Sequence, residues 1–376
     1  MVELDNQRVL VIVYGHFADT MAAIPGLRSL RLAYPSAAID VLALESAAPI
    51  LGPCPFIDRL ITWRDFQHKG ERIARVEKLA AVSALAVRLK RRGYRATLVF
   101  HRSSGAMRRL SNMIGSPVRA GLSVIGDGYT HAANPGSEVE SSRDENRRVL
   151  AAIGVVEDAG PVELWTTGED VAEAARLTGH RRPLVGIHPG SDWSCQQWLP
   201  AGFAEVARTL QEKLGATIVI TGSDAETDLQ AEIARGLSDE PVLACGRTSF
   251  GQFVEVIREL DLLICVNSAA AAIASAVGTP AVVLLGFEDA RYTGAGRVPH
   301  QVVIQPRATA PTAGWCEFGR WGVLSGCNSP MCRGLGGLAG LARSAVVSQA
   351  LGLLAMDSGN ASSRAEPAGA SASRAT

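Results

Sequence analysis

The chain has 376 residues, of which 47% are hydrophobic and 20% charged, and its lysines and arginines balance its aspartates and glutamates. This length and composition predict a globular protein with room for two domains. The zero net charge gives no indication of nucleic-acid binding, so no nucleic-acid partner is expected. No apolar run approaches the roughly 20 residues that span a bilayer.

The first residues and the cysteines together indicate a cellular location. The start, MVELDNQ, places acids ahead of a short apolar run, which is unlike a secretory signal. Seven cysteines are scattered along the chain, and this favours a reducing compartment over a disulfide scaffold. Cys316, Cys327 and Cys332 have a spacing that fits no tight metal-binding pair. We therefore predict a cytoplasmic protein without a metal.

Short runs rich in β-branched residues alternate along the chain with segments of helical periodicity. Such an alternation predicts parallel sheets covered by helices on both faces. Two series of strands predict an α/β protein with two Rossmann-like domains. The first series covers residues 8–15, 38–44, 59–63 and 96–100, and the second covers 184–190, 217–223, 241–246, 261–267, 281–286 and 301–306.

The same patterns predict the domain boundaries. One linking helix is expected between residues 160 and 182, so the N-terminal domain takes residues 1–165 and the C-terminal domain 166–337. A final helix over 338–356 is expected to pack back toward the N-terminal domain. Residues 357–376 have no apolar periodicity, and we expect a disordered tail.

Ligands of open parallel sheets bind beyond the carboxyl ends of the strands, which directs attention to a few turns. The first turn, YGHFADT, contains His16 and Asp19. Asp19 has two compatible roles, as an N-cap of the helix that follows and as a general base at the mouth of a cleft. Proximity to a helix N-terminus favours an ionised carboxylate.

The second half has comparable turns. In HPGSDW, Gly190 allows a close approach of the backbone and Ser191 offers a hydroxyl. His188 is interpreted first as a hydrogen-bonding residue at a strand end. Glu226 is either a solvated glutamate of a first helical turn or a contact for a nucleotide. Thr248 or Ser249 is expected to be an N-cap.

A basic stretch runs from residue 79 to residue 126, with nine lysines and arginines and no acid. It includes Arg102, Arg108 and Arg109. Two interpretations remain open, a solvated basic face or a docking surface for an anionic acceptor or anionic lipid headgroups.

Taken together, these turns resemble glycosyltransferase family 9, the bacterial ADP-heptose:lipopolysaccharide heptosyltransferases, over residues 8–333. The resemblance is carried by VIVYGHFADTMAAIPGLRSL, VGIHPGSDWSCQQWLP and GRTSFGQFVEVIRELDLLICVNSAAAAIASAVGTP. It implies a GT-B fold, in which two Rossmann-like domains with parallel sheets face each other across a cleft. It further implies that the acceptor binds the N-terminal domain and a nucleotide-sugar the C-terminal one. The resemblance also implies that transfer inverts the configuration at the anomeric carbon of the sugar and needs no metal. Asp19 stands at the position of the family's general base.

The resemblance also assigns binding residues and exposes departures from the family pattern. Gln196 stands where the family often has a phosphate-contacting lysine, and the segment from Asn267 to Ala272 stands where it usually has Asp-Thr-Gly-x-x-His. Glu226 matches a nucleotide-contacting glutamate. The implied acceptor residues are His16, Arg102, Arg108 and Arg109, and the implied donor residues are Gly190, Ser191, Gln196, Gly222, Glu226, Asn267, Ser268, Ala269 and Ala270.

The expected function is therefore transfer of a sugar, a heptose from ADP-heptose, to a lipopolysaccharide core or another anionic glycan, at the cytoplasmic face of the inner membrane. The leaving diphosphate is expected at the helix N-terminus formed by Ser268, Ala269 and Ala270, with help from Ser191. Because Gln196 and Ala272 replace polar or charged residues of the family, a protein that binds a nucleotide-sugar with weak or no turnover is the alternative. Another nucleotide-sugar enzyme on the same fold, such as an epimerase or hydrolase, is a third interpretation.

Overall fold

The computed structural model describes residues 2–15, 17–63, 75–100, 105–123, 128–134, 141–156, 160–179, 181–191, 196–286, 298–305, 338 and 340–358. Several predictions of the sequence analysis lie outside these residues. They concern His16, Arg102, the cysteines at 316, 327 and 332, and the expected tail beyond residue 358.

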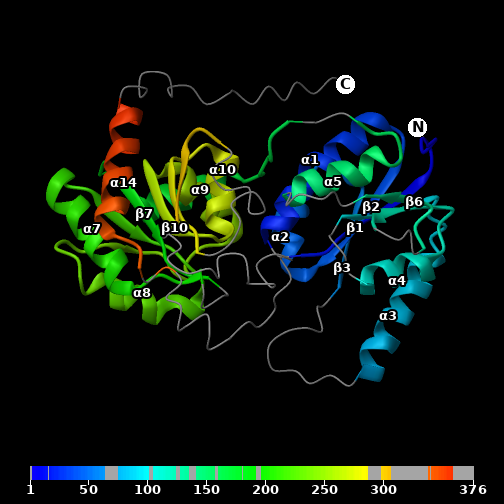
Figure 1. Cartoon of the computed structure of the whole chain (residues 1–376), viewed down its shortest axis with the longest axis horizontal. Coiled ribbons are helices and arrows are strands. Elements are labelled where there is room, and N and C mark those ends of the chain that lie inside the picture. Colours follow the sequence, from blue (N-terminus) through cyan, green and yellow to red (C-terminus); the bar gives the residue numbers. More distant parts are fainter. Residues whose placement is uncertain are drawn as a thin grey trace.

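The described chain forms two six-stranded sheets in which every strand pair is parallel. The first sheet has the order β3-β2-β1-β4-β5-β6 and the second has the order β12-β11-β10-β7-β8-β9. In each sheet the strand order reverses beside the first strand, between β1 and β4 in one and between β7 and β10 in the other. Figure 1 shows the two sheets as neighbouring halves of the molecule, the first on the right. The predicted α/β fold with two Rossmann-like halves is confirmed.

The strands of the first half are β1 (Arg8–Val13), β2 (Ala38–Leu44), β3 (Arg59–Trp63), β4 (Ala96–Phe100), β5 (Val118–Leu122) and β6 (His131–Ala133). Its helices are α1 (Phe17–Ala33), the 3-10 turn η1 (Glu45–Ala47), α2 (Ala48–Leu51), α3 (Arg75–Lys90), α4 (Gly105–Ile114) and α5 (Ser142–Ala151).

The strands of the second half are β7 (Leu184–His188), β8 (Thr217–Ile220), β9 (Val242–Leu243), β10 (Leu262–Val266), β11 (Ala281–Leu284) and β12 (Gln301–Ile304). Its helices are α6 (Gly168–Thr178), α7 (Pro200–Leu214), the 3-10 turn η3 (Asp224–Glu226), α8 (Thr227–Ala234), α9 (Phe250–Glu259), α10 (Ala269–Val277) and α14 (Arg343–Ser358).

Side chains of the buried strands point alternately to the two faces of each sheet, and helices cover both faces. In β1, Val9 and Val11 belong to the same apolar cluster as side chains of α1 and α5. Leu10 and Ile12 point to the opposite face, where side chains of α3 and α4 cover them. Because neighbouring residues of a strand point to opposite faces, a strand covered on both faces must be apolar along its covered length, as observed for the five buried residues of β1 after Arg8.

The C-terminal helix corrects one prediction. We expected a helix over 338–356 that packs toward the N-terminal half. Instead α14 begins at Arg343, lies beside α7 in Figure 1 and contacts α7, β10 and β11. Val346 and Ala350 are fully buried in the cluster of the second sheet, because this face of β10 and β11 would otherwise expose its apolar side chains to water.

Two strands of the first half, β5 and β6, were not predicted. The β5 sequence VRAGL contains an arginine and a glycine, and β6 has only three residues. Neither carries the continuous β-branched pattern that identified the other strands, and their parallel pairing with β4 and with each other is what defines them.

The two halves pack against each other through α1. One apolar cluster continues from α1 and α5 into α9 and α10, and α1 contacts α10 directly. The rings of Phe17 and Phe250 stack with their centroids 6.0 Å apart. The connecting segment adds an edge contact between Trp165 and Phe56. The first turn of α1 is therefore held next to the start of α9.

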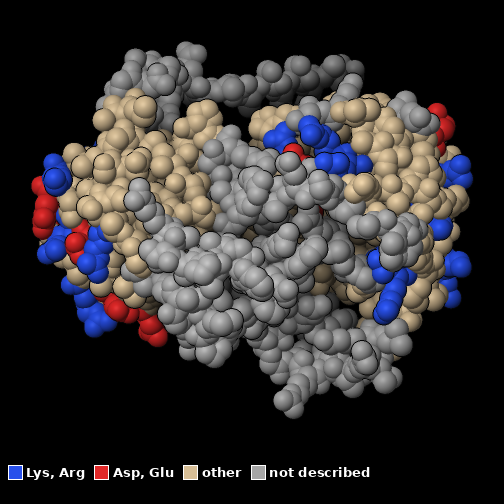
Figure 2. All heavy atoms as spheres, in the orientation of Figure 1, with Lys and Arg blue, Asp and Glu red and all other residues tan. Residues whose placement is uncertain are grey.

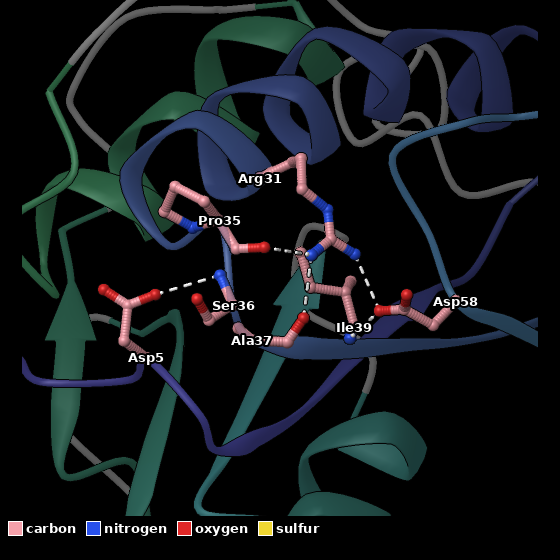
Figure 3. Close-up of polar contacts among 7 residues, drawn as sticks. All are labelled: Asp5, Arg31, Pro35, Ser36, Ala37, Ile39 and Asp58. Atoms are coloured by element: carbon pink, nitrogen blue, oxygen red, sulfur yellow. Dashed lines mark hydrogen bonds and ion pairs between the residues drawn. The ribbon is translucent and has the colours of Figure 1, made fainter. Parts of the chain in front are cut away.

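The C-terminal end of α1 is tied to the edge of the first sheet by Arg31. Figure 3 shows its guanidinium between three acceptors: it donates to Ala37 O at 2.8 Å, to Pro35 O at 3.1 Å and to Asp58 Oδ2 at 2.7 Å. The same Asp58 oxygen accepts the backbone N–H of Ile39 at 2.7 Å. This cluster joins α1 to the start of β2 and to the segment before β3.

Replacing Asp58 with alanine is expected to destabilise the first half, because Arg31 and the Ile39 N–H lose a shared acceptor. Exposure of this ion pair limits the loss to about 1–2 kcal/mol, measured as a lower midpoint in urea. Asp5→Ala is the matched control, since Asp5 accepts only a single longer bond from this cluster, from Ser36 N at 3.1 Å. Equal midpoints for the two variants would contradict the assigned role of Asp58.

Candidate functional site

Asp19 lies in the first turn of α1, directly after the carboxyl end of β1. The sequence predicts a helix that starts near Asp19, with Asp19 as its N-cap. That prediction is wrong in position, because α1 begins at Phe17. Asp19 is half-buried, and it lies in the first turn of α1.

Gly15 makes room for this carboxylate. Its φ of +151° is one that side-chain-bearing residues rarely adopt, and a Cβ placed there would lie 2.5 Å from Asp19 Oδ2. The turn therefore brings the backbone against one edge of the carboxyl group.

The opposite half of the carboxylate is held by a residue that sequence reasoning missed. Ser142, the first residue of α5, donates its hydroxyl to Asp19 Oδ1 at 2.7 Å. Four residues later, Asn146 donates to Ala22 O at 3.2 Å, so α5 is fixed along α1. Because Ser142 and Asp19 are 123 residues apart in the sequence, no local sequence motif predicts this contact.

The N-terminus of α5 is itself well capped. The Ser141 hydroxyl is the N-cap and accepts from Asp144 N at 3.3 Å. Its own proton goes to Asp144 Oδ2 at 2.7 Å. The two adjacent serines thus have different roles: Ser141 caps the N-terminus of α5, and Ser142 forms a hydrogen bond to α1.

The predicted donor residues gather at one edge of the second sheet. They follow β7, β8 and β10, which are neighbours in the order β10-β7-β8. Parallel strands end at the same edge, so these turns lie close together. This is the arrangement that the sequence analysis expected for a bound ligand.

His188, at the end of β7, is part of the framework of this edge. Its Nδ1 lies 3.0 Å from Thr221 Oγ1, and its ring packs against Phe253 at 5.6 Å. Burial lowers the pKa of His188 to about 4, and the negative charge of Glu226 only partly opposes this shift. The imidazole is therefore neutral at neutral pH, and the interpretation as a hydrogen-bonding strand-end residue is confirmed.

Glu226 is held in a fixed position by the turn after β8. Its Oε2 accepts from Ser223 N at 2.6 Å and from Ser223 Oγ at 2.9 Å, as part of a capping box. The carboxyl group lies directly on Gly190 and Gly222, where an added Cβ would meet the Glu226 oxygens. Three predicted donor residues are thus brought into contact.

Ser191 and Gln196 are also brought together. Ser191 donates its hydroxyl to Gln196 Oε1 at 2.7 Å, and Gln196 is buried. Trp198, two residues later, is buried against Phe203 in an edge-to-face contact. Gln196 is neutral, so this position supplies hydrogen bonding where a lysine would supply charge.

The N-terminus of α10 follows β10 directly. Its N-cap, Ser268, has an extended backbone and forms no capping bond with its side chain. The Ser268 Oγ is buried and has no hydrogen-bond partner among the residues that the structure describes. The first-turn N–H groups of this helix are therefore not consumed by a side-chain cap, and such groups bind anions well.

The alanines that follow are packing residues. Ala270 and Ala271 are buried in the apolar cluster shared with α1, and Ala269 and Ala272 are half-buried. Ala271 O accepts from Gln301 Nε2 at 2.7 Å. Small side chains allow this helix to lie against α9 and α1, while Asn267 and Ser268 are the polar side chains at its start.

Only part of the predicted acceptor set can be placed. His16 and Arg102 lie outside the described residues. Arg108 and Arg109 both lie on α4, the first half-buried and the second exposed.

The described residues include no group of three or more histidine, cysteine or acidic side chains arranged to hold a metal. Burial raises the pKa of Cys54 to about 11 and that of Cys245 to about 12, so these thiols stay protonated at neutral pH. The N-cap predicted at Thr248 or Ser249 is confirmed at Ser249, which closes α9 in a capping box with Gln252. Within the same part of the chain, no helix has the length and hydropathy needed to cross a bilayer.

Residues 140–316 match the model of one protein family, described as glycosyltransferase family 9 (heptosyltransferase). Among curated relatives, lipopolysaccharide heptosyltransferase 3 of Escherichia coli is 28% identical over 300 residues, which cover 72% of this chain and 81% of the relative.

Solved structures agree with this match. A glycosyltransferase family 9 protein from Veillonella parvula superposes with a TM-score of 0.76 at 20% identity and covers 94% of this chain and 99% of its own. The ADP-heptose lipopolysaccharide heptosyltransferase II of E. coli has a TM-score of 0.68 at 18% identity and covers 93% and 99%. These neighbours share the GT-B fold. These matches support a glycosyltransferase that is similar to the heptosyltransferases of family 9 in sequence and in fold.

Proposed function

We propose that the protein transfers a heptose from ADP-heptose, with inversion, to a lipopolysaccharide core or a similar anionic glycan, and that Asp19 is the general base. The observation that carries this proposal is the position of Asp19. Its carboxylate stands at the carboxyl end of β1, and its helix packs on α9 and α10, next to the donor edge of the second sheet.

The relatives support the substrates. One solved neighbour is named for ADP-heptose and lipopolysaccharide, and the curated relative is a lipopolysaccharide heptosyltransferase. Carried over to this chain, they suggest a nucleotide-sugar donor and an acceptor with carboxylates and phosphates. His16, Arg102, Arg108 and Arg109 are the residues that we assign to the acceptor, and the three arginines supply positive charge.

The chemistry is a single displacement. Asp19 takes the proton of an acceptor hydroxyl while that oxygen attacks the anomeric carbon of the sugar. The bond from this carbon to the diphosphate oxygen breaks, and its electron pair leaves with ADP. Attack and departure on opposite faces invert the configuration. The sugar passes through an oxocarbenium-like state, as in glycoside hydrolysis.

The leaving diphosphate needs stabilisation, and α10 is positioned to supply it. Its first-turn N–H groups and the unpartnered Ser268 hydroxyl lie at the carboxyl end of β10. Backbone donors and a helix N-terminus stabilise a developing oxyanion without any side-chain charge. Ser191 adds a hydroxyl from the neighbouring turn, and Glu226, beside Gly190 and Gly222, is the group that we assign to the nucleotide.

One specific observation favours a slower enzyme as the second candidate. Gln196 is neutral and already bonded to Ser191, and the α10 alanines are packed into the core. Loss of one electrostatic donor costs about 10² to 10³ in rate. A protein that binds the nucleotide-sugar with little turnover is therefore the alternative to a fully active transferase.

The proposed setting is the cytoplasmic face of the inner membrane, where the acceptor is presented. The donor is a co-substrate, and neither a metal nor a nucleic acid has a part in this proposal.

Asp19→Asn keeps the size of the side chain and removes its basicity. We expect kcat to fall by about 10² to 10⁴ with little change in ADP binding, measured by ADP release with ADP-heptose and a lipopolysaccharide-core acceptor. Asp228→Asn, an exposed change on α8, is the control. An unchanged rate in Asp19→Asn would eliminate Asp19 as the base.

Ser142→Ala is expected to lower kcat about tenfold, because one hydrogen bond that orients the Asp19 carboxylate is lost. The KM for the donor should not change, and Ser142→Thr should restore most of the rate. The adjacent Ser141→Ala removes the α5 cap and should lower the melting temperature instead. Equal effects of the two alanine variants on kcat would argue against a specific role of Ser142.

Gly190→Ala tests the donor edge, because the new Cβ would overlap the Glu226 carboxylate. Overpacking of this size costs about 1–3 kcal/mol, so ADP should bind roughly tenfold more weakly or worse in calorimetry. Gly168→Ala is the matched control, since a Cβ there meets nothing within 4 Å. Wild-type affinity of Gly190→Ala for ADP would contradict the assignment of Glu226 to the nucleotide site.

A further inference from the structure

The outer surface of α3 and α4 combines exposed cations with exposed apolar side chains. Both helices bury residues on the same face of the first sheet, such as Leu89 of α3 and Leu110 of α4, and they contact each other. Their opposite sides therefore point outward together. We call this the α3–α4 surface, formed by Ala84, Val87, Arg88, Arg91, Ala106, Arg109 and Met113, all of which are exposed.

The periodicity of each helix places these residues in one stripe. In α3, positions 87 and 88 follow position 84 by three and four residues, and Arg91, directly after the helix, follows positions 87 and 88 by four and three. In α4, positions 106, 109 and 113 are likewise three and four residues apart. Residues with such spacing lie on one helical face. Val87 is 50% exposed and Met113 39% exposed, so an apolar side chain accompanies the cations on both helices.

The positive charge of this surface is not neutralised by the described part of the chain. Arg92, nearby, pairs with Asp40 at 3.1 Å, and Arg119 donates to Gly128 O and Ser116 O. Arg88, Arg91 and Arg109 form no ion pair with any described residue. In Figure 2, blue spheres lie over α4 without red ones among them.

We propose that the α3–α4 surface docks on a bilayer that contains anionic lipids. Cations attract the charged headgroups, and Val87 and Met113 enter the boundary between headgroups and acyl chains. A soluble polyanion would use the arginines and leave both apolar side chains in water. The choice of a bilayer also rests on the proposed function, because a lipopolysaccharide acceptor carries its own lipid.

The fold leaves the rest of the enzyme free when this surface is docked. The helices α3 and α4 cover the face of the first sheet opposite to α1 and α5. The contacts of α1 with α9 and α10 therefore lie away from the bilayer. Docking would hold the first half at the membrane without interfering with the packing of the second.

Sedimentation of the whole protein with vesicles tests this proposal. Binding is expected to vesicles of phosphatidylcholine mixed with phosphatidylglycerol, and not to phosphatidylcholine alone. Each cation near an anionic surface changes partitioning about fivefold, so Arg88→Glu/Arg91→Glu should weaken binding tenfold or more. Arg208→Glu/Arg235→Glu, an equal change of charge on exposed residues of the second half, should leave binding unchanged.

A second variant tests the apolar contribution. Val87→Ser/Met113→Ser should weaken the binding that persists at high salt, where electrostatic attraction is screened. Thermal unfolding of each variant checks that its fold is intact. No binding to anionic vesicles, or equal binding by both charge-reversed proteins, would overturn the proposal. Binding of heparin but not of vesicles would assign the surface to a soluble polyanion instead.

Transfer assays separate this proposal from the proposed function. Arg88→Glu/Arg91→Glu should keep wild-type transfer to a lipid-free core fragment and lose transfer to acceptor embedded in anionic vesicles. If no variant and no wild-type protein transfers to either acceptor while vesicle binding follows the expected pattern, the proposed function fails and the docking surface stands. Unimpaired transfer to the embedded acceptor in the charge-reversed protein would overturn the docking surface alone.

Discussion

The packing of α1 against α9 and α10 is the constraint on which the site depends. The apolar cluster that supports α1 on the first sheet is continuous with the cluster under α9 and α10. Each half completes its own parallel sheet, but the turn that carries Asp19 belongs to the region where the two meet. A change in this packing would alter the distance between Asp19 and the turns that follow β7, β8 and β10. In an enzyme site, a shift of about 1 Å is enough to reduce a rate strongly.

The sequence was sufficient to predict most of the framework, for reasons that are local. Strands such as AVVL and LLICV are apolar at every position because both of their faces are covered, and this pattern predicted them directly. The sequence also predicts that Gly190 lets the backbone approach a ligand, and the resemblance adds Gly222 to the donor residues. In the structure, the group that lies against both glycines is the Glu226 carboxylate, and a ligand contact stays a prediction.

The remainder depended on contacts between distant segments. Ser142 reaches Asp19 only because α5 lies along α1, and no spacing in the chain encodes this meeting. The predicted position of α14 was wrong. Its apolar residues show that the helix packs on a sheet, but they do not show which of the two sheets it packs on. The helix start at Phe17 differed from the expected one because capping signals define a helix end only within a few residues.

The capping box at Ser223 has a consequence for recognition at the donor edge. Both the amide and the hydroxyl of Ser223 donate to the Glu226 carboxylate, and the carboxylate packs against Gly190 and Gly222, where an added Cβ would overlap it. The rotamer entropy of this glutamate is therefore lost when the chain folds rather than when a ligand arrives. A ligand that uses this carboxylate meets a preorganised acceptor, and its affinity is not reduced by the ordering of a flexible side chain.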